Sequence, residues 1–146
     1  MKIFIDGDSC PVVSETIKVA RRRNLDVTIV KNINHVINSS YAKIVSVDPA
    51  NESADIYIAN NVSKGDIVIS QDYGLAALVI PKNVKVISPN GFEINNSNLD
   101  TLLHHRFIAS KLRRQKRYYG SKAKKRTNKD DLKFRELLIE TIDKQN

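Results

Sequence analysis

Near the N-terminus, residues 2–8 read KIFIDGD, a short apolar run that stops at two aspartates, Asp6 and Asp8. An unbroken run of apolar and β-branched residues is typical of a strand that is buried on both faces, as in a parallel sheet. Pro11 then suits the first turn of a helix, and apolar residues spaced along 13–20 mark one face of that helix. A buried strand followed at once by a helix predicts an α/β fold.

The alternation of strand and helix patterns continues along the chain. Further strands are predicted at residues 25–30, 43–47, 65–70 and 84–87, and helices at about 50–61, 73–80, from 97 towards 120, and after 128–131. Such alternation implies right-handed crossovers between parallel strands. The predicted fold class is α/β, with a single Rossmann-like domain whose mostly parallel five-stranded sheet is covered by helices and followed by a basic C-terminal helical extension.

Length and composition agree with one domain. The chain has 146 residues, of which 41% are hydrophobic and 27% charged, and this balance is typical of a globular protein. We expect a single domain over residues 1–146, with its core at about 1–96 and the extension at about 97–146. Its single cysteine, Cys10, excludes an intrachain disulfide and a zinc site built on several thiolates. No signal-type or membrane-spanning apolar run is present, so a soluble, cytoplasmic protein is expected.

Charge is distributed unevenly along the chain. Residues 1–100 carry ten Lys/Arg and eleven Asp/Glu, whereas residues 101–129 carry eleven Lys/Arg and no acid. A block of this density repels itself unless an anionic partner relieves it, so nucleic acid is the predicted partner. The alternative is a solvated basic tail without a specific ligand.

Four aspartates are predicted to meet at one edge of the sheet. In an open α/β sheet, ligands bind at the carboxyl ends of the strands. Asp6 and Asp8 follow the first strand, Asp72 follows the fourth, and Asp55 lies in the first turns of the helix that leaves the third. Asp26 and Asp66 begin their strands and are predicted to be structural, on the opposite edge.

Clustered carboxylates repel one another unless a cation lies between them. Oxygen-only ligation is what Mg²⁺ or Mn²⁺ accepts, and such an ion can activate water and shield the charge of a phosphodiester. The four acids and the basic block together favour metal-dependent phosphodiester hydrolysis. A helix cap or a turn is the structural alternative for each aspartate taken alone.

Four segments of the chain resemble the YaiI/YqxD family of bacterial proteins. They are IDGDSCPV at residues 5–12, ADIYI at 54–58, GDIVISQDYGLA at 65–76 and SPNG at 88–91. The family in turn looks like a PIN-like branch of nucleases, whose members use clustered acids with magnesium or manganese to cut RNA or structured nucleic acid. The resemblance therefore implies a PIN-like domain, and it favours RNA over DNA.

The resemblance also assigns roles to single residues. Asp6 matches the first acid of PIN-like proteins, Asp72 and Ser70 match their Ser/Thr-x-Asp motif, and Asp55 falls where many of them have Glu. Asp6, Asp55 and Asp72 are therefore the expected metal ligands, with Ser70 orienting Asp72. Our own hypothesis adds that Asp8 assists through water. The family's acidic–basic pair ahead of a phenylalanine has only acids here, at Asp130 and Asp131. Basic residues of the extension are the expected phosphate contacts, namely Arg106, Arg113, Arg114, Lys116 and Arg117.

Two other functions fit some of the same residues. A module that binds nucleic acid without cutting it would use the basic block alone. A phosphatase of the haloacid-dehalogenase type also has an Asp-x-Asp motif after its first strand, but Gly65 and Asp66 precede a strand where that family's second motif should follow one. Histidines 104 and 105 are read as surface residues beside Arg106, and oligomeric state is left open.

Overall fold

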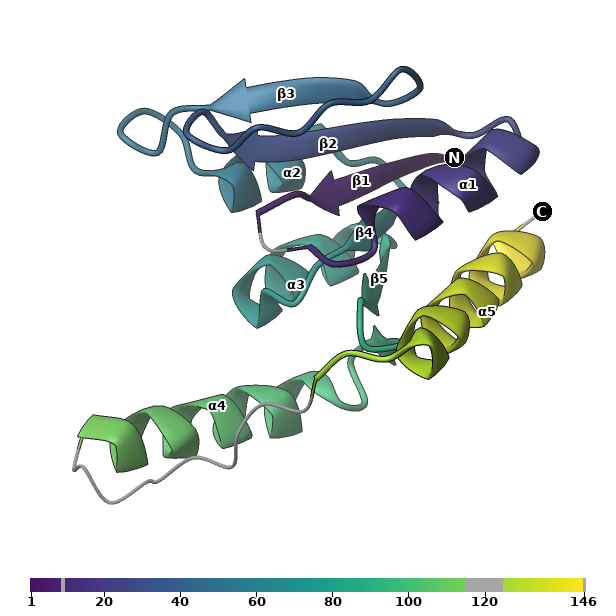
Figure 1. Cartoon of the computed structure of the whole chain (residues 1–146). Helices are drawn as coiled ribbons and strands as arrows, with labels where there is room; N and C mark the ends of the chain where they lie inside the picture. Colours follow the sequence, from purple (N-terminus) through teal and green to yellow (C-terminus); the bar gives the residue numbers. More distant parts are fainter. Residues whose placement is uncertain (9, 115–124, 146) are drawn as a thin grey trace.

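The computed structural model describes residues 1–8, 10–114 and 125–145. Its centre is a six-stranded sheet in the order β3-β2-β1-β4-β5-β6 (Figure 1). The strands are β1 (Lys2–Asp6), β2 (Asp26–Asn32), β3 (Lys43–Val47), β4 (Ile67–Ile69), β5 (Lys85–Ser88) and β6 (Phe92–Ile94). The first five are parallel, and β6 pairs antiparallel with β5. The predicted α/β class with a mostly parallel sheet is thus confirmed.

Five α-helices connect and cover the strands. They are α1 (Val13–Arg22), α2 (Ala54–Asn61), α3 (Tyr73–Val79), α4 (Leu99–Arg114) and α5 (Asn128–Gln145), with a short 3-10 helix, η1 (Ile80–Lys82), after α3. Alternate residues of β1 serve the two faces of the sheet. Ile3 and Ile5 are buried beneath α1 and α5, whereas Phe4 is buried beneath α2 and α3. Burial on both faces explains why the run of residues 2–6 is continuously apolar.

The last helix, α5, is part of the core packing. Phe134, Leu138 and Ile142 are fully buried in the same cluster as Ile3 and Ile5. The helix packs along α1 and against β5, although nearly the whole chain separates α5 from β1 (Figure 1). None of the helices in the described part of the chain is both long enough and apolar enough to cross a membrane.

Two elements differ from the sequence prediction. The second helix begins at Ala54 and not at about residue 50, because Asp48 closes a turn in which its carboxylate accepts from the Ala50 N–H at 3.0 Å. A sixth strand, β6, follows the turn predicted at residues 88–91, where Gly91 has a φ of 88°. With three residues, β6 is too short to show an alternating pattern.

Strand order reverses between β1 and β4. From β1 the chain builds outward through β2 to β3, then crosses back to β4 and continues to β6 on the other side. Such a switch point leaves a crevice at the carboxyl ends of the two central strands, because the connections leave them in opposite directions. Asp6 ends β1, and Asp72 follows β4 by three residues, so both lie at this crevice.

Candidate functional site

Side chains from three separate segments meet at the switch point. They enclose a small pocket of about 110 Å³. We call it the acidic pocket, and its lining residues are Asp6, Asp8, Cys10, Ser70, Gln71, Asp72 and Pro89. The structure therefore brings together three of the four predicted acids, and Ser70 with them.

Ser70 links two of these acids. Its side chain is almost fully buried, and its hydroxyl donates to Asp6 Oδ2 at 3.0 Å. The same oxygen accepts from the backbone N–H of Asp72 at 2.9 Å. Ser70 thus holds the Asp6 side chain and the Asp72 backbone in one hydrogen-bonded unit, as neighbouring parallel strands allow.

Asp72 is held from its other side by helix α3. Its carboxylate Oδ1 accepts from the backbone N–H of Leu75 at 3.1 Å, which makes Asp72 the N-cap of that helix. One carboxylate oxygen is committed to the cap, and the residue still lines the acidic pocket. Asp72 therefore both caps helix α3 and contributes a carboxylate to the acidic pocket.

Burial raises the pKa of Asp6 to about 6. The hydrogen bond from Ser70 opposes this rise, and the like charges of Asp72, Asp8 and Asp55 add to it. A carboxylate that is both desolvated and surrounded by other carboxylates is the electrostatic setting that a cation would stabilise.

Asp8 is engaged by the segment that follows β2. Both of its carboxylate oxygens lie 3.1 Å from the backbone N of Asn32, and Oδ1 also pairs with His35 Nδ1. The aspartate therefore tethers the end of β2 to the loop after β1, in addition to lining the pocket. Its carboxylate is less available to a ligand than those of Asp6 and Asp72.

Asp55 lies beside the acidic pocket and does not line it. It is in the first turn of α2, and its carboxylate accepts from the Ser53 hydroxyl. It is near enough for its charge to help raise the pKa of Asp6. Across the described ranges, no three acids, histidines or cysteines are placed so that they could hold one ion together. The donor set fits a hydrated Mg²⁺ or Mn²⁺ held by one or two carboxylates, with water completing the shell.

Arg126 is a residue of this site that the sequence did not single out. Its Nε donates to Asp131 Oδ1 at 2.7 Å, and its Nη2 donates to the carbonyl oxygen of Pro89 at 2.8 Å. Pro89 lines the acidic pocket, so the guanidinium lies at the rim, where it is paired with Asp131.

Cys10 lies in the wall of the acidic pocket, and burial raises the pKa of its thiol. A backbone hydrogen bond at Val12 opposes the rise, the charge of Asp6 adds to it, and the charge of Arg126 again opposes it. A thiol held in its neutral form is a small pocket-lining group and a poor nucleophile.

The basic extension begins on α4, which reaches beyond the sheet (Figure 1). Arg106, Arg113 and Arg114 are exposed there, as are His104 and His105. None of the sixteen residues of α4 is buried. Two other predicted phosphate contacts, Lys116 and Arg117, lie outside the described residues.

A comparison with known protein families matches nearly the whole chain. A family model described as "Uncharacterized BCR, YaiI/YqxD family" matches residues 4–144. The chain belongs to the YaiI/YqxD family. This result confirms the resemblance found in the sequence, and the match includes both the acidic pocket and α5.

Relatives within the YaiI/YqxD family cover nearly the whole chain. A "UPF0178 protein" of Natranaerobius thermophilus is 44% identical over 142 residues, which is 97% of this chain and 96% of the relative. Another, from Alkaliphilus oremlandii, is 43% identical over 98% of this chain and 92% of the relative. A third, from Clostridium kluyveri, is 43% identical over 97% and 93%. No solved structure gives a significant match.

Proposed function

We propose that this protein is a divalent-metal-dependent, PIN-like nuclease that hydrolyses phosphodiester bonds in RNA or structured nucleic acid. One observation carries the proposal: Asp6 and Asp8 at the end of β1 and Asp72 after β4 line one small pocket, in which the pKa of Asp6 is raised to about 6. Folding concentrates negative charge there at a free-energy cost, which a bound cation would remove.

Asp6 and Asp72 are the residues that would hold Mg²⁺ or Mn²⁺, with Asp55 as a third ligand once its carboxylate leaves the Ser53 hydroxyl. Such an ion supplies positive charge to the phosphate and makes bound water more acidic. Asp8 accepts a hydrogen bond from a water molecule on the pocket side, and Ser70 keeps Asp6 and Asp72 in register.

Nucleic acid reaches this pocket with the help of basic side chains. Arg106, Arg113 and Arg114 on α4 contact phosphates, and Arg126 adds a positive charge at the pocket rim. An acidic pocket with an arginine at its rim is suited to an anionic polymer, because positive side chains neutralise phosphates that the acids would otherwise repel. Lys116 and Arg117 belong to the same basic block of the sequence.

Replacing Asp6 by Asn tests the proposal. Asp6→Asn should abolish Mn²⁺-supported cleavage of RNA and weaken Mn²⁺ binding, measured by calorimetry, while the protein stays folded. Asp26→Asn is the matched control, since Asp26 is an exposed aspartate at the opposite end of its strand. Cleavage by Asp6→Asn at the parental rate would remove Asp6 from the mechanism.

A second candidate is a nucleic-acid-binding module without hydrolysis. The engagement of Asp8 by Asn32 and His35 favours it, because a carboxylate that tethers a loop is less free to take part in catalysis. Binding that survives both Asp6→Asn and Asp72→Asn, with no cleavage by any form of the protein, would select this second function.

A further inference from the structure

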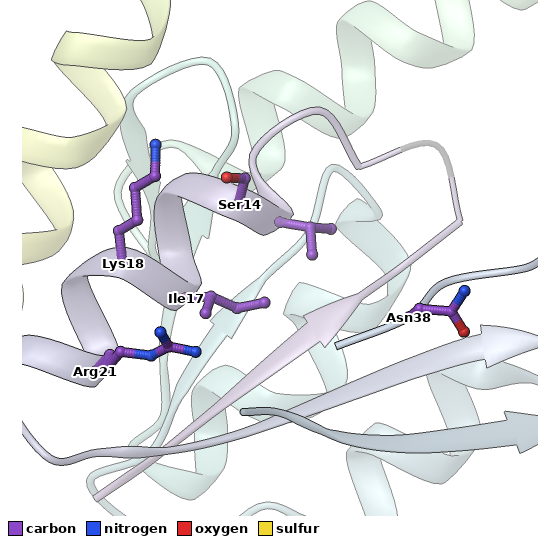
Figure 2. Close-up of a pocket in the computed structure, with 6 residues that line it drawn as sticks. Ser14, Ile17, Lys18, Arg21 and Asn38 are labelled. Atoms are coloured by element: carbon purple, nitrogen blue, oxygen red, sulfur yellow. The ribbon is translucent and has the colours of Figure 1, made fainter. Parts of the chain in front are cut away.

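A larger cavity, of about 380 Å³, lies between helix α1 and the segment that follows β2 (Figure 2). We call it the α1 groove, and it is lined by Val13, Ser14, Ile17, Lys18, Arg21 and Asn38. Its volume is within the range of small-ligand pockets, roughly 300–1,000 Å³. It is separate from the acidic pocket, with which it shares no lining residue.

The α1 groove combines three kinds of side chain. Val13 and Ile17 supply apolar surface, Ser14 and Asn38 supply hydrogen-bonding groups, and two cations complete the lining. Figure 2 shows Ile17 and Arg21 extending from α1 on the side that faces Asn38. Apolar surface beside cations is the combination that a nucleotide needs, because its base is flat and weakly polar while its phosphate is charged.

Both cations of the groove are available to an anion. Lys18 is 4.0 Å from Glu15, but that glutamate is already paired with Arg135 at 3.0 Å. Arg21 makes no ion pair with any carboxylate of the described residues. Its guanidinium lies over the ring of Tyr41, 5.3 Å from the centroid, which fixes its position while leaving N–H groups at its edge.

Both walls of the α1 groove start at the acidic pocket. One wall, α1, begins three residues after Cys10, which lines that pocket. The other wall contains Asn38 and belongs to the segment that Asp8 tethers through Asn32 and His35. One end of the groove, at the start of α1, therefore lies near the acids.

We infer that the α1 groove binds one nucleotide of a single-stranded nucleic acid, next to the phosphodiester that faces the acidic pocket. Its phosphate pairs with Lys18 and Arg21, and its base lies on Val13 and Ile17. The choice of nucleic acid as ligand rests on the proposed function. Binding in the groove does not depend on hydrolysis, so the two can be tested separately.

Fluorescence anisotropy of a labelled single-stranded oligoadenylate, in EDTA to prevent turnover, tests the inference. Lys18→Gln combined with Arg21→Gln should weaken binding roughly tenfold at low salt and lower the salt slope by about 1.4, since each phosphate contact on a single strand contributes about 0.7. The matched control combines Lys2→Gln with Lys64→Gln, two exposed lysines at the edge of the sheet opposite the acidic pocket. It removes the same charge and should change binding much less.

The outcomes separate this inference from the proposed function. Equal loss of binding in the groove variant and in the control, or no loss in either, would overturn the groove and leave the nuclease proposal standing. A selective loss in the groove variant supports the groove even if no form of the protein cleaves RNA. A blunt duplex of the same sequence hides its bases. If the Lys18 and Arg21 substitutions weaken duplex binding as much as single-strand binding, the proposed contact between the base and the groove is wrong.

Discussion

Folding disfavours the ionised form of Asp6 in the acidic pocket. Its pKa is about 6 in the folded protein and 3.8 in an unfolded chain, so between these two pH values the folded state binds more protons than the unfolded state. Stability conferred by protonated Asp6 is therefore complete below about pH 4 and is lost as the pH rises through about 6.

Asp6→Asn should remove this pH dependence. In EDTA at pH 7, the variant should be more stable than the parent by about 1–2 kcal/mol, a value reduced to allow for solvent screening of a partly exposed group. Urea unfolding at several pH values measures the difference. A parental profile that is flat between pH 4 and 6 would show that the carboxylate is not strained by folding.

Ser70→Ala should make Asp6 harder to ionise. The Ser70 hydroxyl lowers the pKa of Asp6, so its loss raises that pKa further, and Mn²⁺ binding should reach half-saturation at a higher pH. Ser88 is a matched control, because it is also a buried serine at a strand end and its hydroxyl accepts from the backbone N–H of Asn90 at 3.1 Å. Ser88→Ala should cost about 1 kcal/mol of stability without moving the pH of Mn²⁺ binding.

Which strand ends carry the acids could be predicted from the sequence, although the same reasoning also expected Asp55, which lies beside the pocket and does not line it. Asp6, Asp8 and Asp72 follow strands that end at one edge, and Asp66, predicted to be structural, accepts from the backbone N–H groups of Lys2 and Ser63 at the other edge. The partners of Asp8 could not be predicted. They come from a segment without secondary-structure pattern, whose path is set by tertiary contacts.

At the scale of single elements, helix α5 is rich in charged residues and still contributes three fully buried side chains to the core. The sequence predicts this helix, and Phe134, Leu138 and Ile142 on its inner face are all fully buried. Its partners, α1 and β5, were not predictable, since side-chain periodicity shows which face of a helix is buried but not what covers it. The late start of α2 has a similar cause, because a turn closed by Asp48 precedes the helix.

Phe134→Ala should destabilise the protein by roughly 3–5 kcal/mol, because it leaves a cavity in a closely packed core. Phe107 on α4 is the matched control, with 57% of its surface exposed. Phe107→Ala should change the free energy of unfolding by less than about 0.5 kcal/mol. Chemical denaturation of the two variants measures both values, and equal losses would mean that α5 does not hold the core together.

On the scale of the whole molecule, the positive charge is concentrated in one segment of the chain, and the core is not. Residues 101–129 carry eleven Lys/Arg and no acid, more positive charge than the net +8 of the whole chain, whereas the core takes residues from both ends of the sequence. We expect nucleic-acid binding to depend on this block. Replacing Arg106, Arg113 and Arg114 together by Gln should lower the slope of log affinity against log salt by about 2 on a single strand.

A control for the charge block uses lysines at the starts of strands. Lys2, Lys43 and Lys64 are exposed at the edge opposite the acidic pocket, and their joint replacement by Gln removes the same total charge. Filter binding over a range of salt concentrations compares the two triple variants. Equal slopes would mean that only net charge matters and that α4 has no special part in binding.

The packing of α5 against the sheet residues of β1 determines the order in which the protein can fold during synthesis. During synthesis, α5 cannot cover its face of the sheet until Phe134, Leu138 and Ile142 have left the ribosome. The whole basic block has already emerged by then. The interior of each new molecule therefore closes only after its basic block has emerged, and folding finishes with the docking of α5.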